Sequence, residues 1–264
     1  MTLETLNSLF NQKQIEDLNM TVYLVDDGSR DGTSQAVALR FPQVCLLQGD
    51  GSLFWNGGMR KAFATALATG FDSYLWFNDD TLLEEDALHR LVACAKDIRD
   101  SYEYAIVVGS IRDPRTREWT YGGVKKKGSG FRLDFKAQLP DDSRSIRCDT
   151  MNGNFTLITA EVATRLGNLD HAFKHQLGDF DYGLRATKAG IPIFIAPGYF
   201  GYCSDNPSSG TWRDTELPFK KRWKHLMSPK GAPPKEWFLY TSRHFGWRWP
   251  IYAVSPYVKS LFCR

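Results

Sequence analysis

The chain has 264 residues, of which 42% are hydrophobic and 24% are charged, with a formal net charge of +3. This length fits one α/β domain with an appendage or two small domains, and the composition is that of an ordinary globular protein. A charge so close to neutral gives no indication of nucleic-acid binding, and no apolar run has the length of a membrane span.

The five cysteines limit the compartment and the chemistry. Their number is odd and none forms a Cys-x-x-Cys pair, which argues against a disulfide framework or a zinc cluster. The N-terminal segment 1–14 lacks the apolar core of a signal peptide. We therefore expect a cytoplasmic protein.

The first hundred residues predict helices and strands in alternation. We expect helices over 3–14, 33–40, 58–69 and 84–97, and short apolar strands over 20–25, 43–47 and 73–77. Such alternation predicts an α/β fold with a doubly wound, mostly parallel sheet and helices on both faces. Two of these strands end directly in carboxylates, and ligands of open α/β sheets bind outside the carboxyl ends of the strands.

The rest of the chain is less regular. We expect a strand over 105–108, hairpins within 112–149, a strand within 149–159, helices over 160–166 and 180–189, and a last strand over 191–196. From residue 219 onward the sequence has ten Lys and Arg residues but only one acidic residue, Glu236. Aromatic residues lie between the basic ones. This composition favours an extension that docks on an anionic membrane surface, and packing of the tail on the rest of the chain is the alternative.

The first acidic cluster follows the 20–25 strand and reads Asp26-Asp27-Gly28-Ser29-Arg30-Asp31-Gly32-Thr33. Its carboxylates can accept hydrogen bonds from the N–H of a nucleobase or from ribose hydroxyls. Asp31 or Thr33 alone would also serve as an ordinary helix N-cap. The cluster is therefore a candidate nucleoside site or a helix start.

A second cluster, Asn78-Asp79-Asp80, ends the 73–77 strand. Adjacent carboxylates repel each other unless a cation joins them, and hard oxygen ligands suit Mg²⁺ or Mn²⁺ carrying a diphosphate. The alternative is a solvated turn that caps the helix beginning near Glu84.

A third cluster places Asp179 and Asp181 at a predicted helix start. Negative charge there complements the helix dipole, which is a structural explanation. One of these carboxylates could instead act as a general base on a substrate hydroxyl.

In this order and spacing, the three clusters resemble the motifs of the family 2 glycosyltransferases, over about residues 5–206. Segment 49–60 resembles the family's donor loop, and segment 150–155 its acceptor-side strand. The nearest subgroup is that of the bacterial rhamnosyltransferase-like members. The resemblance implies a GT-A fold and an inverting transfer of sugar from a nucleotide-diphosphate donor to a glycan or lipid-linked acceptor, in polysaccharide biosynthesis of the cell envelope. No nucleic-acid partner is expected.

The resemblance also implies roles for single residues. Asp179 would be the catalytic base, and Asp80 with Asp79 would hold Mg²⁺ or Mn²⁺. Donor-binding residues would be Asp26, Asp27, Ser29, Asp31, Gly51, Trp55, Asn56, Gly57, Asn78 and Asp79, and acceptor-side residues Asn152, Gly153, Asn154, Asp181 and Arg185. The donor-binding half would cover 1–110, the acceptor-binding and catalytic half 111–206, and the basic aromatic extension 207–264.

Three departures from the family pattern keep other functions open. Asn78 stands where the metal motif has its first acid, Gly178 stands where many members have Glu before the base, and segment 201–206 lacks the His that often follows the last strand. A non-catalytic protein that binds nucleotide sugars or glycans is therefore an alternative. A sugar-nucleotide pyrophosphorylase is a weaker one, because the sequence lacks the glycine-rich basic phosphate loop that it would need.

Family members begin with an apolar strand ahead of the first helix, whereas this sequence opens on the helix itself. We therefore expect the first strand to be missing and the given start to be internal to a longer protein, with a natural short form as the alternative. The 20–25 strand would then keep unpaired backbone groups along one edge.

Overall fold

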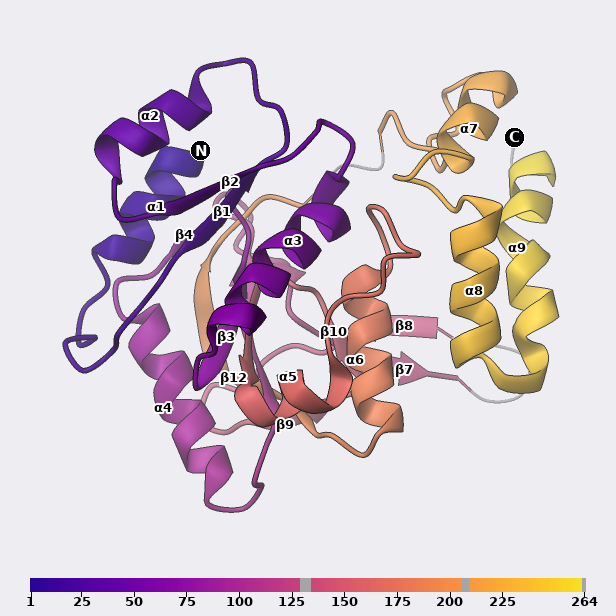
Figure 1. The fold of residues 1–264 in the computed structure, drawn as a ribbon. Coiled ribbons are helices and arrows are strands. Elements are labelled where there is room, and N and C mark those ends of the chain that lie inside the picture. Colours follow the sequence, from indigo (N-terminus) through magenta and orange to yellow (C-terminus); the bar gives the residue numbers. More distant parts are fainter. Residues whose placement is uncertain (129–133, 206–208, 263–264) are drawn as a thin grey trace.

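The computed structural model describes residues 1–128, 134–205 and 209–262. A mixed central sheet is covered by helices on both faces, and two smaller sheets lie beside it (Figure 1). The α/β class expected from the alternation of elements is confirmed.

The helices and strands follow the order expected for the first two hundred residues. The helices are α1 (Thr2–Phe10), α2 (Thr33–Arg40), α3 (Phe54–Thr69), α4 (Ala87–Arg99), α5 (Ala160–Leu166), α6 (Gly178–Lys188), α7 (Phe219–Leu226), α8 (Pro234–His244) and α9 (Trp249–Phe262), with a 3-10 turn η1 (Gly246–Arg248). The strands are β1 (Tyr23–Asp26), β2 (Cys45–Gln48), β3 (Ser73–Phe77), β4 (Leu82–Leu83), β5 (Ile106–Arg112), β6 (Trp119–Tyr121), β7 (Gly123–Lys127), β8 (Asp134–Ala137), β9 (Ile146–Cys148), β10 (Thr150–Met151), β11 (Phe155–Thr159) and β12 (Ile193–Tyr202).

The central sheet has the strand order β3-β11-β5-β12-β4, with β6 beside β5 and β9 beside β12. β5 and β12 pair in parallel, whereas β11 lies antiparallel between β3 and β5. The sheet is thus less parallel than the sequence alone indicates. The excursion through β6–β10 returns the chain at the carboxyl end of β3, and Phe155 at the start of β11 pairs with Phe77 at the end of β3. β11 therefore has to run in the opposite direction.

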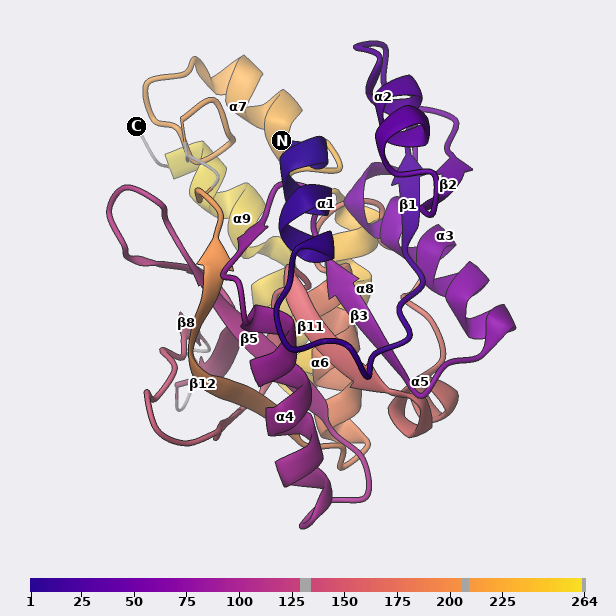
Figure 2. The ribbon, with the colours of Figure 1, turned by 90° about the vertical axis from the view of Figure 1, so that its left-hand side faces the viewer.

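Different helices cover the two faces of the central sheet (Figure 2). On one face, side chains of α1 and α4 join a core that includes Leu75 and Phe77 of β3. On the other face, α3, α5 and α6 contribute to a second core with Tyr74 and Trp76. Successive residues of β3 therefore pack into opposite cores, as expected of a strand covered on both sides.

β1 and β2 form a parallel pair of their own. Across the described ranges, β1 pairs with β2, β3 pairs with β11, and no register joins β1 to β3. The two strands that carry the first two acidic clusters therefore belong to separate sheets.

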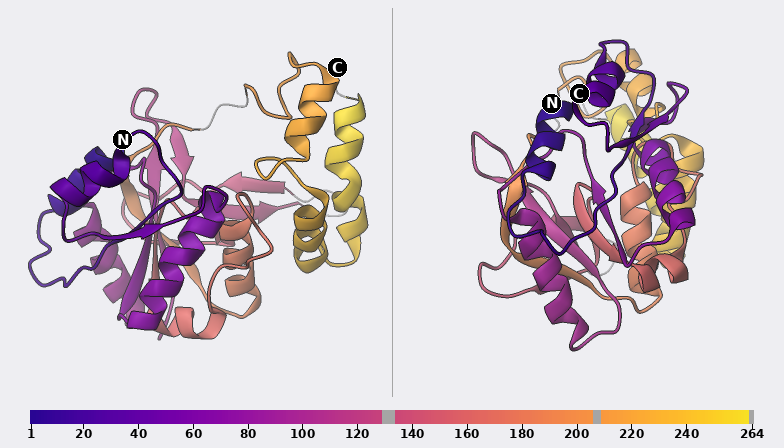
Figure 3. Two further views of the ribbon diagram at one scale, coloured as in Figure 1. Left: turned by 45° about the horizontal axis from the view of Figure 1, so that its top comes forward. Right: turned by 60° about the vertical axis from the view of Figure 1, so that its left-hand side comes forward.

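The C-terminal extension contains the helices α7, α8 and α9 and the 3-10 turn η1, with a loop over 227–233 between α7 and α8. α8 and α9 lie side by side, and α8 packs on α6 (Figures 1 and 3). Tyr240 and Phe245 join Phe173 and Leu184 in a buried cluster. Part of the tail thus packs on the rest of the chain, as one of the two alternatives expects. Among the helices that the structure describes, none is long and apolar enough to cross a membrane.

Candidate active site

The candidate active site lies at the carboxyl end of β3. Trp55, in the first turn of α3, donates its indole Nε1–H to Asn78 Oδ1 at 2.8 Å. The backbone N–H of Asn78 in turn donates to the carbonyl of Asn154 at 3.2 Å. A Cβ on Gly153 would lie only 2.7 Å from the Trp55 ring, so the indole rests directly on this loop. Trp55, in the predicted donor loop, therefore contacts both the end of β3 and the predicted acceptor-side segment.

Asp27 fixes the loop that leads into α3. Its Oδ1 accepts the N–H of Gly51 at 2.8 Å, and its Oδ2 accepts the N–H groups of Leu53 and Phe54 at 2.9 and 3.0 Å. Gly49 has no room for a side chain, because a Cβ there would lie 2.4 Å from Asp27 Oδ1. The structure thus places this predicted donor residue where it shapes the loop at the start of α3.

Asp26 and Asp31 shape the turn before α2. Buried Asp26 accepts the N–H of Ser29 at 2.8 Å and the hydroxyl of Ser34, and the hydrogen bond from Ser34 is the main cause that holds the pKa of Asp26 below its ordinary value. Asp31 accepts the N–H and hydroxyl of Thr33, at 3.1 and 2.7 Å. Of the predicted donor residues in this turn, Ser29 and Asp31 are exposed to solvent.

Asn78, Asp79 and Asp80 form the turn after β3. Asp79 Oδ2 accepts the hydroxyl of Thr2 at 2.8 Å. Partial desolvation and then the charge of Asp79 raise the pKa of Asp80. A divalent cation would relieve this repulsion, so the two carboxylates fit Mg²⁺ or Mn²⁺.

Within the described residues, no cluster of three or more His, Cys, Asp or Glu residues could hold a metal. Mg²⁺ sites of substrate complexes commonly use one or two carboxylates and complete their shell with phosphates and water. The pair formed by Asp79 and Asp80 matches that kind of site.

Asp179 lies in the first turn of α6. Its Oδ2 accepts the N–H of Gly153 at 3.1 Å, and its Oδ1 accepts the N–H of Phe180 at 2.8 Å. Desolvation raises the pKa of Asp179 to about 6, against the opposing effect of these two donors. A carboxylate of this kind is a stronger base than an ordinary aspartate and remains ionised at neutral pH.

The loop between β10 and β11 brings the base to the Trp55 edge. The carbonyl of Asn152 accepts the hydroxyl of Thr156 at 3.0 Å, and its Oδ1 lies 3.4 Å from the N–H of Gly122. Asn154 is buried, and its Nδ2 has no partner among the described residues. Gly153, between them, connects the loop to Asp179. The three predicted acceptor-side residues of this loop are therefore brought together.

Asn56 fastens α3 to the loop ahead of α6. It is fully buried, and its Nδ2 donates to the carbonyls of Asp170 and Phe173 at 3.0 and 2.5 Å. Gly57 in the same turn is also buried. Asn56 therefore holds structure and is out of reach of a donor bound at the surface. Its Oδ1 fills the space beside Gly178, where a Cβ would lie 1.7 Å away, which explains the glycine before the base.

Asp181 anchors α8 to α6. Its Oδ2 accepts Nε–H of Arg185 at 2.8 Å, and its Oδ1 accepts Nη1–H of Arg243 at 2.7 Å and Nε2–H of His244 at 2.8 Å. Burial alone raises the pKa of Asp181, but these hydrogen bonds and the charges of the arginines hold it below its ordinary value. Asp181 is completely buried. We call Asp181, Arg185, Arg243 and His244 the Asp181 cluster. Asp181 and Arg185 are thus both engaged by protein groups.

Sequence reasoning missed His175 and the two members of the Asp181 cluster that α8 contributes. His175 Nδ1 lies 3.4 Å from the N–H of Trp55, and its ring meets Phe54 edge-on at 5.9 Å. Desolvation, and then the charge of Lys230, lower the pKa of His175. A lone histidine gives no pattern in the sequence. Asp181 and Arg185 lie four residues apart, which predicts an ionic contact on one helix face. Arg243 and His244 lie about sixty residues further along the chain, and no local pattern reveals them as partners of Asp181.

Two residues beside the site have strained backbones. Phe54 has φ of 54° and Leu177 has φ of 70°, although neither is glycine. They precede the donor-loop tryptophan and the segment of the base, respectively. Such outliers persist where the surrounding structure holds them, and they concentrate at functional sites.

Comparisons with known proteins agree with this geometry. Residues 1–163 match the profile of Glycosyl transferase family 2. S. aureus TarS superposes with a TM-score of 0.56 and 14% identity over 93% of this chain and 41% of its own. GalNAc-T7, solved with UDP, GalNAc and Mn²⁺, gives a TM-score of 0.57 and 13% identity over 90% and 47%. The chain spans less than half the length of either, and such low identity shows the fold alone. No curated protein matches the chain.

The family profile covers more than half of the chain, including the first two acidic clusters and the loop that holds Gly153. Both solved structures share the arrangement of sheet and helices over nine tenths of the chain or more. The chain therefore belongs to glycosyltransferase family 2 and is a glycosyltransferase of GT-A fold.

Proposed function

We propose that this glycosyltransferase moves a sugar from a nucleotide-diphosphate donor to a hydroxyl of a glycan or lipid-linked acceptor, with inversion at the anomeric carbon. The observation that supports this most is the state of Asp179, whose pKa is raised to about 6 by desolvation. The carboxylate lies one hydrogen bond from Gly153, on which the Trp55 ring rests.

Asp179 suits the role of general base for chemical reasons. Each of its oxygens accepts one backbone N–H, and a carboxylate has about four acceptor positions, so lone pairs remain for a substrate hydroxyl. The acceptor proton passes to Asp179 while the acceptor oxygen forms a bond to the anomeric carbon. The bond from that carbon to the diphosphate oxygen breaks, and its electron pair leaves with the diphosphate. One displacement of this kind inverts the configuration.

Asp79 and Asp80 are the residues that would hold Mg²⁺ or Mn²⁺. When bound, the ion would supply positive charge to the diphosphate leaving group. Desolvation, and then the charge of Asp79, raise the pKa of Asp80, and a bound cation would offset both effects, which supports this assignment. The structure of GalNAc-T7 was solved with UDP, GalNAc and Mn²⁺, which is the same class of donor and ion.

The donor side would use the two loops that Asp26 and Asp27 hold in place. Ser29 and Asp31 offer exposed polar groups for the nucleoside, and Gly51 contributes backbone to the loop before α3. The amino-terminal end of α3 lies at this edge, and helix N-termini favour phosphate. Trp55 offers an aromatic surface between the donor and acceptor sides.

The C-terminal helices would bring the enzyme to an anionic membrane surface on the cytoplasmic side. Ala253, Pro256 and Ser260 of α9 are buried, whereas Ile251, Val254, Val258 and Leu261 on its other side are 46–59% exposed. An apolar stripe open to solvent is unusual for a helix that packs on its own protein. Exposed lysines, Lys235 on α8 and Lys259 on α9, add positive charge beside it. Apolar side chains with neighbouring lysines are typical of a helix that lies in a lipid interface.

The activity is tested by incubating the purified protein with a panel of nucleotide-diphosphate sugars, with and without Mn²⁺, and measuring release of nucleoside diphosphate. We expect release from one donor class, stimulated by the ion. The same donor should raise the apparent stability of the protein in a thermal-shift assay, since a ligand of the folded state stabilises it. A protein that binds a donor but neither transfers nor hydrolyses it under any condition would contradict the catalytic proposal.

The membrane proposal is tested by co-sedimentation with vesicles that contain or lack anionic lipid. The double variant Val254→Glu with Val258→Glu should pellet much less than the wild type on anionic vesicles. Leu39→Glu on α2 is the matched control, because Leu39 is an apolar side chain 83% exposed elsewhere on the surface. Equal pelleting on neutral and anionic vesicles, or none at all, would refute the proposal.

A further inference from the structure

Arg243 of α8 contacts two carboxylates that lie on either side of the start of α6. Its Nη1–H donates to Asp181 Oδ1 at 2.7 Å, and its Nη2–H donates to Asp170 Oδ2 at 2.8 Å. Asp181 lies in the first turn of α6, two residues after Asp179, and Asp170 lies in the loop ahead of that helix. Two carboxylates that share one guanidinium would repel each other without it. Arg243 therefore fixes the loop and the first turn of α6 relative to each other.

The same loop is bound to the donor side of the candidate site. The carbonyl oxygen of Asp170 accepts Nδ2–H of Asn56 at 3.0 Å. Asn56 follows Trp55 directly in the first turn of α3. A chain of contacts thus runs from the predicted donor loop through Asp170 and Arg243 to the helix that carries Asp179.

The place of the Asp179 carboxylate depends on where the first turn of α6 lies. In the described part of the chain, this carboxylate accepts one hydrogen bond from another segment, from the N–H of Gly153 at 3.1 Å, and one from adjacent Phe180. Leu177, just ahead of the turn, has φ of 70°, a conformation that persists only where the surroundings hold it. A shift of the turn by about 1 Å would break the contact with Gly153, and a misplacement of that size can cost about a hundredfold in rate.

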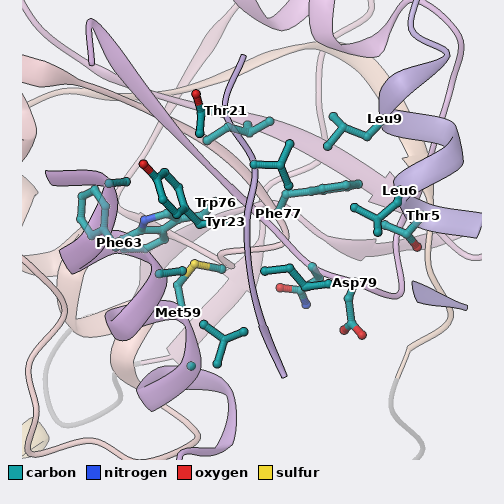
Figure 4. A pocket seen from close by; sticks show the side chains of 18 of the residues that line it. Thr5, Leu6, Leu9, Thr21, Tyr23, Met59, Phe63, Trp76, Phe77 and Asp79 are labelled. Carbon is teal, nitrogen blue, oxygen red and sulfur yellow. The ribbon is translucent and has the colours of Figure 1, made fainter. Parts of the chain in front are cut away.

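On another side, α6 packs on the central sheet. The ring of fully buried Tyr182 meets the ring of Trp76 on β3 edge-on at 4.8 Å. Trp76 also lines the cavity of about 630 Å³ whose lining includes Asp79 (Figure 4). Apolar packing has no direction, whereas charge-assisted hydrogen bonds require a defined geometry. The contacts with α8 therefore add a fixed direction that packing on the sheet does not supply.

His244, the next residue of α8, contacts the same carboxylate. Its Nε2 lies 2.8 Å from Asp181 Oδ1, and its side chain is 3% exposed. Its backbone carbonyl accepts Nζ–H of Lys126 on β7 at 3.0 Å. Asp181 is therefore held against an end of α8 that is itself attached to a strand.

We propose that Arg243 and His244 are positioning residues, which act through Asp181 to set the place of the Asp179 carboxylate relative to the donor loop. Neither of them touches substrate in this role. The C-terminal extension, through α8, is then part of the machinery of transfer. The proposal rests on the role of Asp179 as base in the proposed function.

A double-mutant cycle between Arg243→Met and Asp179→Asn tests this role. A residue that acts through the base slows transfer only while the base is present. We expect Arg243→Met to lower the single-turnover rate at saturating donor about tenfold or more, but by less than about twofold in the Asp179→Asn background. The KM for the donor should change by less than about twofold, because the predicted donor residues are untouched.

Trp237→Phe is the matched control on α8. It removes the hydrogen bond from Trp237 Nε1–H to the carbonyl of Tyr252 at 2.9 Å, which joins α8 to α9, and leaves the contacts with Asp181 in place. All rates are compared at a temperature at which urea titration shows each variant almost entirely folded. We expect Trp237→Phe to lose stability without the tenfold loss of rate.

Conservative replacements provide a rescue. Arg243→Lys keeps a cation that can reach one of the two carboxylates, so it should transfer faster than Arg243→Met. His244→Gln keeps an N–H donor and should transfer faster than His244→Leu.

Hydrogen exchange supplies a readout that needs no activity. The amide of Gly153, which donates to Asp179, should exchange at least about tenfold faster in Arg243→Met, with amides of β5 unchanged. His244→Leu gives the same readout if Arg243→Met does not fold.

Two results would overturn the proposal. One is an equal slowing by Arg243→Met with and without Asp179, since the effect would then be one on the fold as a whole. The other is a wild-type rate together with unchanged exchange at Gly153 in Arg243→Met. Full transfer by Asp179→Asn alone would instead refute the base itself, so the two failures are distinguishable.

Discussion

Replacing Asp179 by Asn should abolish most of the transfer and, at the same time, make the stability of the protein relative to the wild type rise with pH. The base is lost because an amide cannot take the acceptor proton. We expect turnover at saturating donor to fall by about two orders of magnitude or more, the usual range for losing a general base. Donor binding should remain, since Asp179 lies on the acceptor side of Trp55.

The stability change follows from the raised pKa. The folded protein binds the Asp179 proton more tightly than the unfolded chain does, because desolvation raises the pKa of Asp179 from its ordinary value of 3.8 to about 6. Ionisation therefore costs stability, and the cost is absent below about pH 4, grows between about pH 4 and 6, and is complete above that. A difference of roughly two pKa units corresponds to about 2–3 kcal/mol.

Asn also removes one acceptor, so either Gly153 or Phe180 loses its partner. That loss costs about 1–3 kcal/mol but does not depend on pH. The informative quantity is therefore the difference in unfolding free energy between variant and wild type, measured by urea titration at several pH values. It should shift in favour of Asp179→Asn by about 2–3 kcal/mol between pH 4 and pH 8.

Asp141→Asn is a suitable control. Hydrogen bonds from Ser143 lower the pKa of Asp141 to about 2, so its contribution to stability is lost only below about pH 4, and the difference between Asp141→Asn and the wild type should stay nearly constant from pH 4 to pH 8. A flat difference for Asp179→Asn across this range would show that Asp179 is not desolvated in the way the structure indicates. Full transfer activity in this variant would refute its role as the base.

Three further predictions concern the same region. The kcat/KM of transfer should fall about tenfold per unit below about pH 6 as Asp179 becomes protonated, and a profile flat down to pH 5 would contradict this. Asp80→Asn should raise the Mn²⁺ concentration for half-maximal activity on the order of tenfold or more, and an unchanged ion requirement would remove Asp80 from the metal site. Arg243→Met should cost about 1–3 kcal/mol of unfolding free energy because buried Asp181 loses one of its two arginine partners, whereas Lys235→Met on the exposed side of α8 should cost little.

Local patterns were sufficient for much of the first two hundred residues. The bounds of α2, β3 and α5 agree with those expected from periodicity and turn residues. Asp179 lies at a helix start, as the sequence predicts, and its role as the base stays a prediction. By contrast, the antiparallel direction of β11 depends on where a long excursion returns, which no local pattern contains.

Contacts between distant parts of the chain account for what sequence reasoning could not place. Asn56 looked like a donor-loop amide, but burial directs its side chain to carbonyls more than a hundred residues away. Asp181 looked like an acceptor-side acid, yet it is bonded to residues of α8. α9 gives no clear amphipathic period in the sequence, because its apolar residues face both the protein and the solvent.

The close fit between Gly178 and Asn56 has a consequence for sequence exchange within the family. In this chain, Asn56 of α3 fills a small volume between α3 and α6. Its Oδ1 takes the space that a Cβ at position 178 of α6 would need. A relative with Glu before its base has to fill that volume from the α6 side and leave it empty at the position matching Asn56. The two positions should therefore vary together, and a graft that changes only one of them would push α6, and Asp179 with it, away from Trp55.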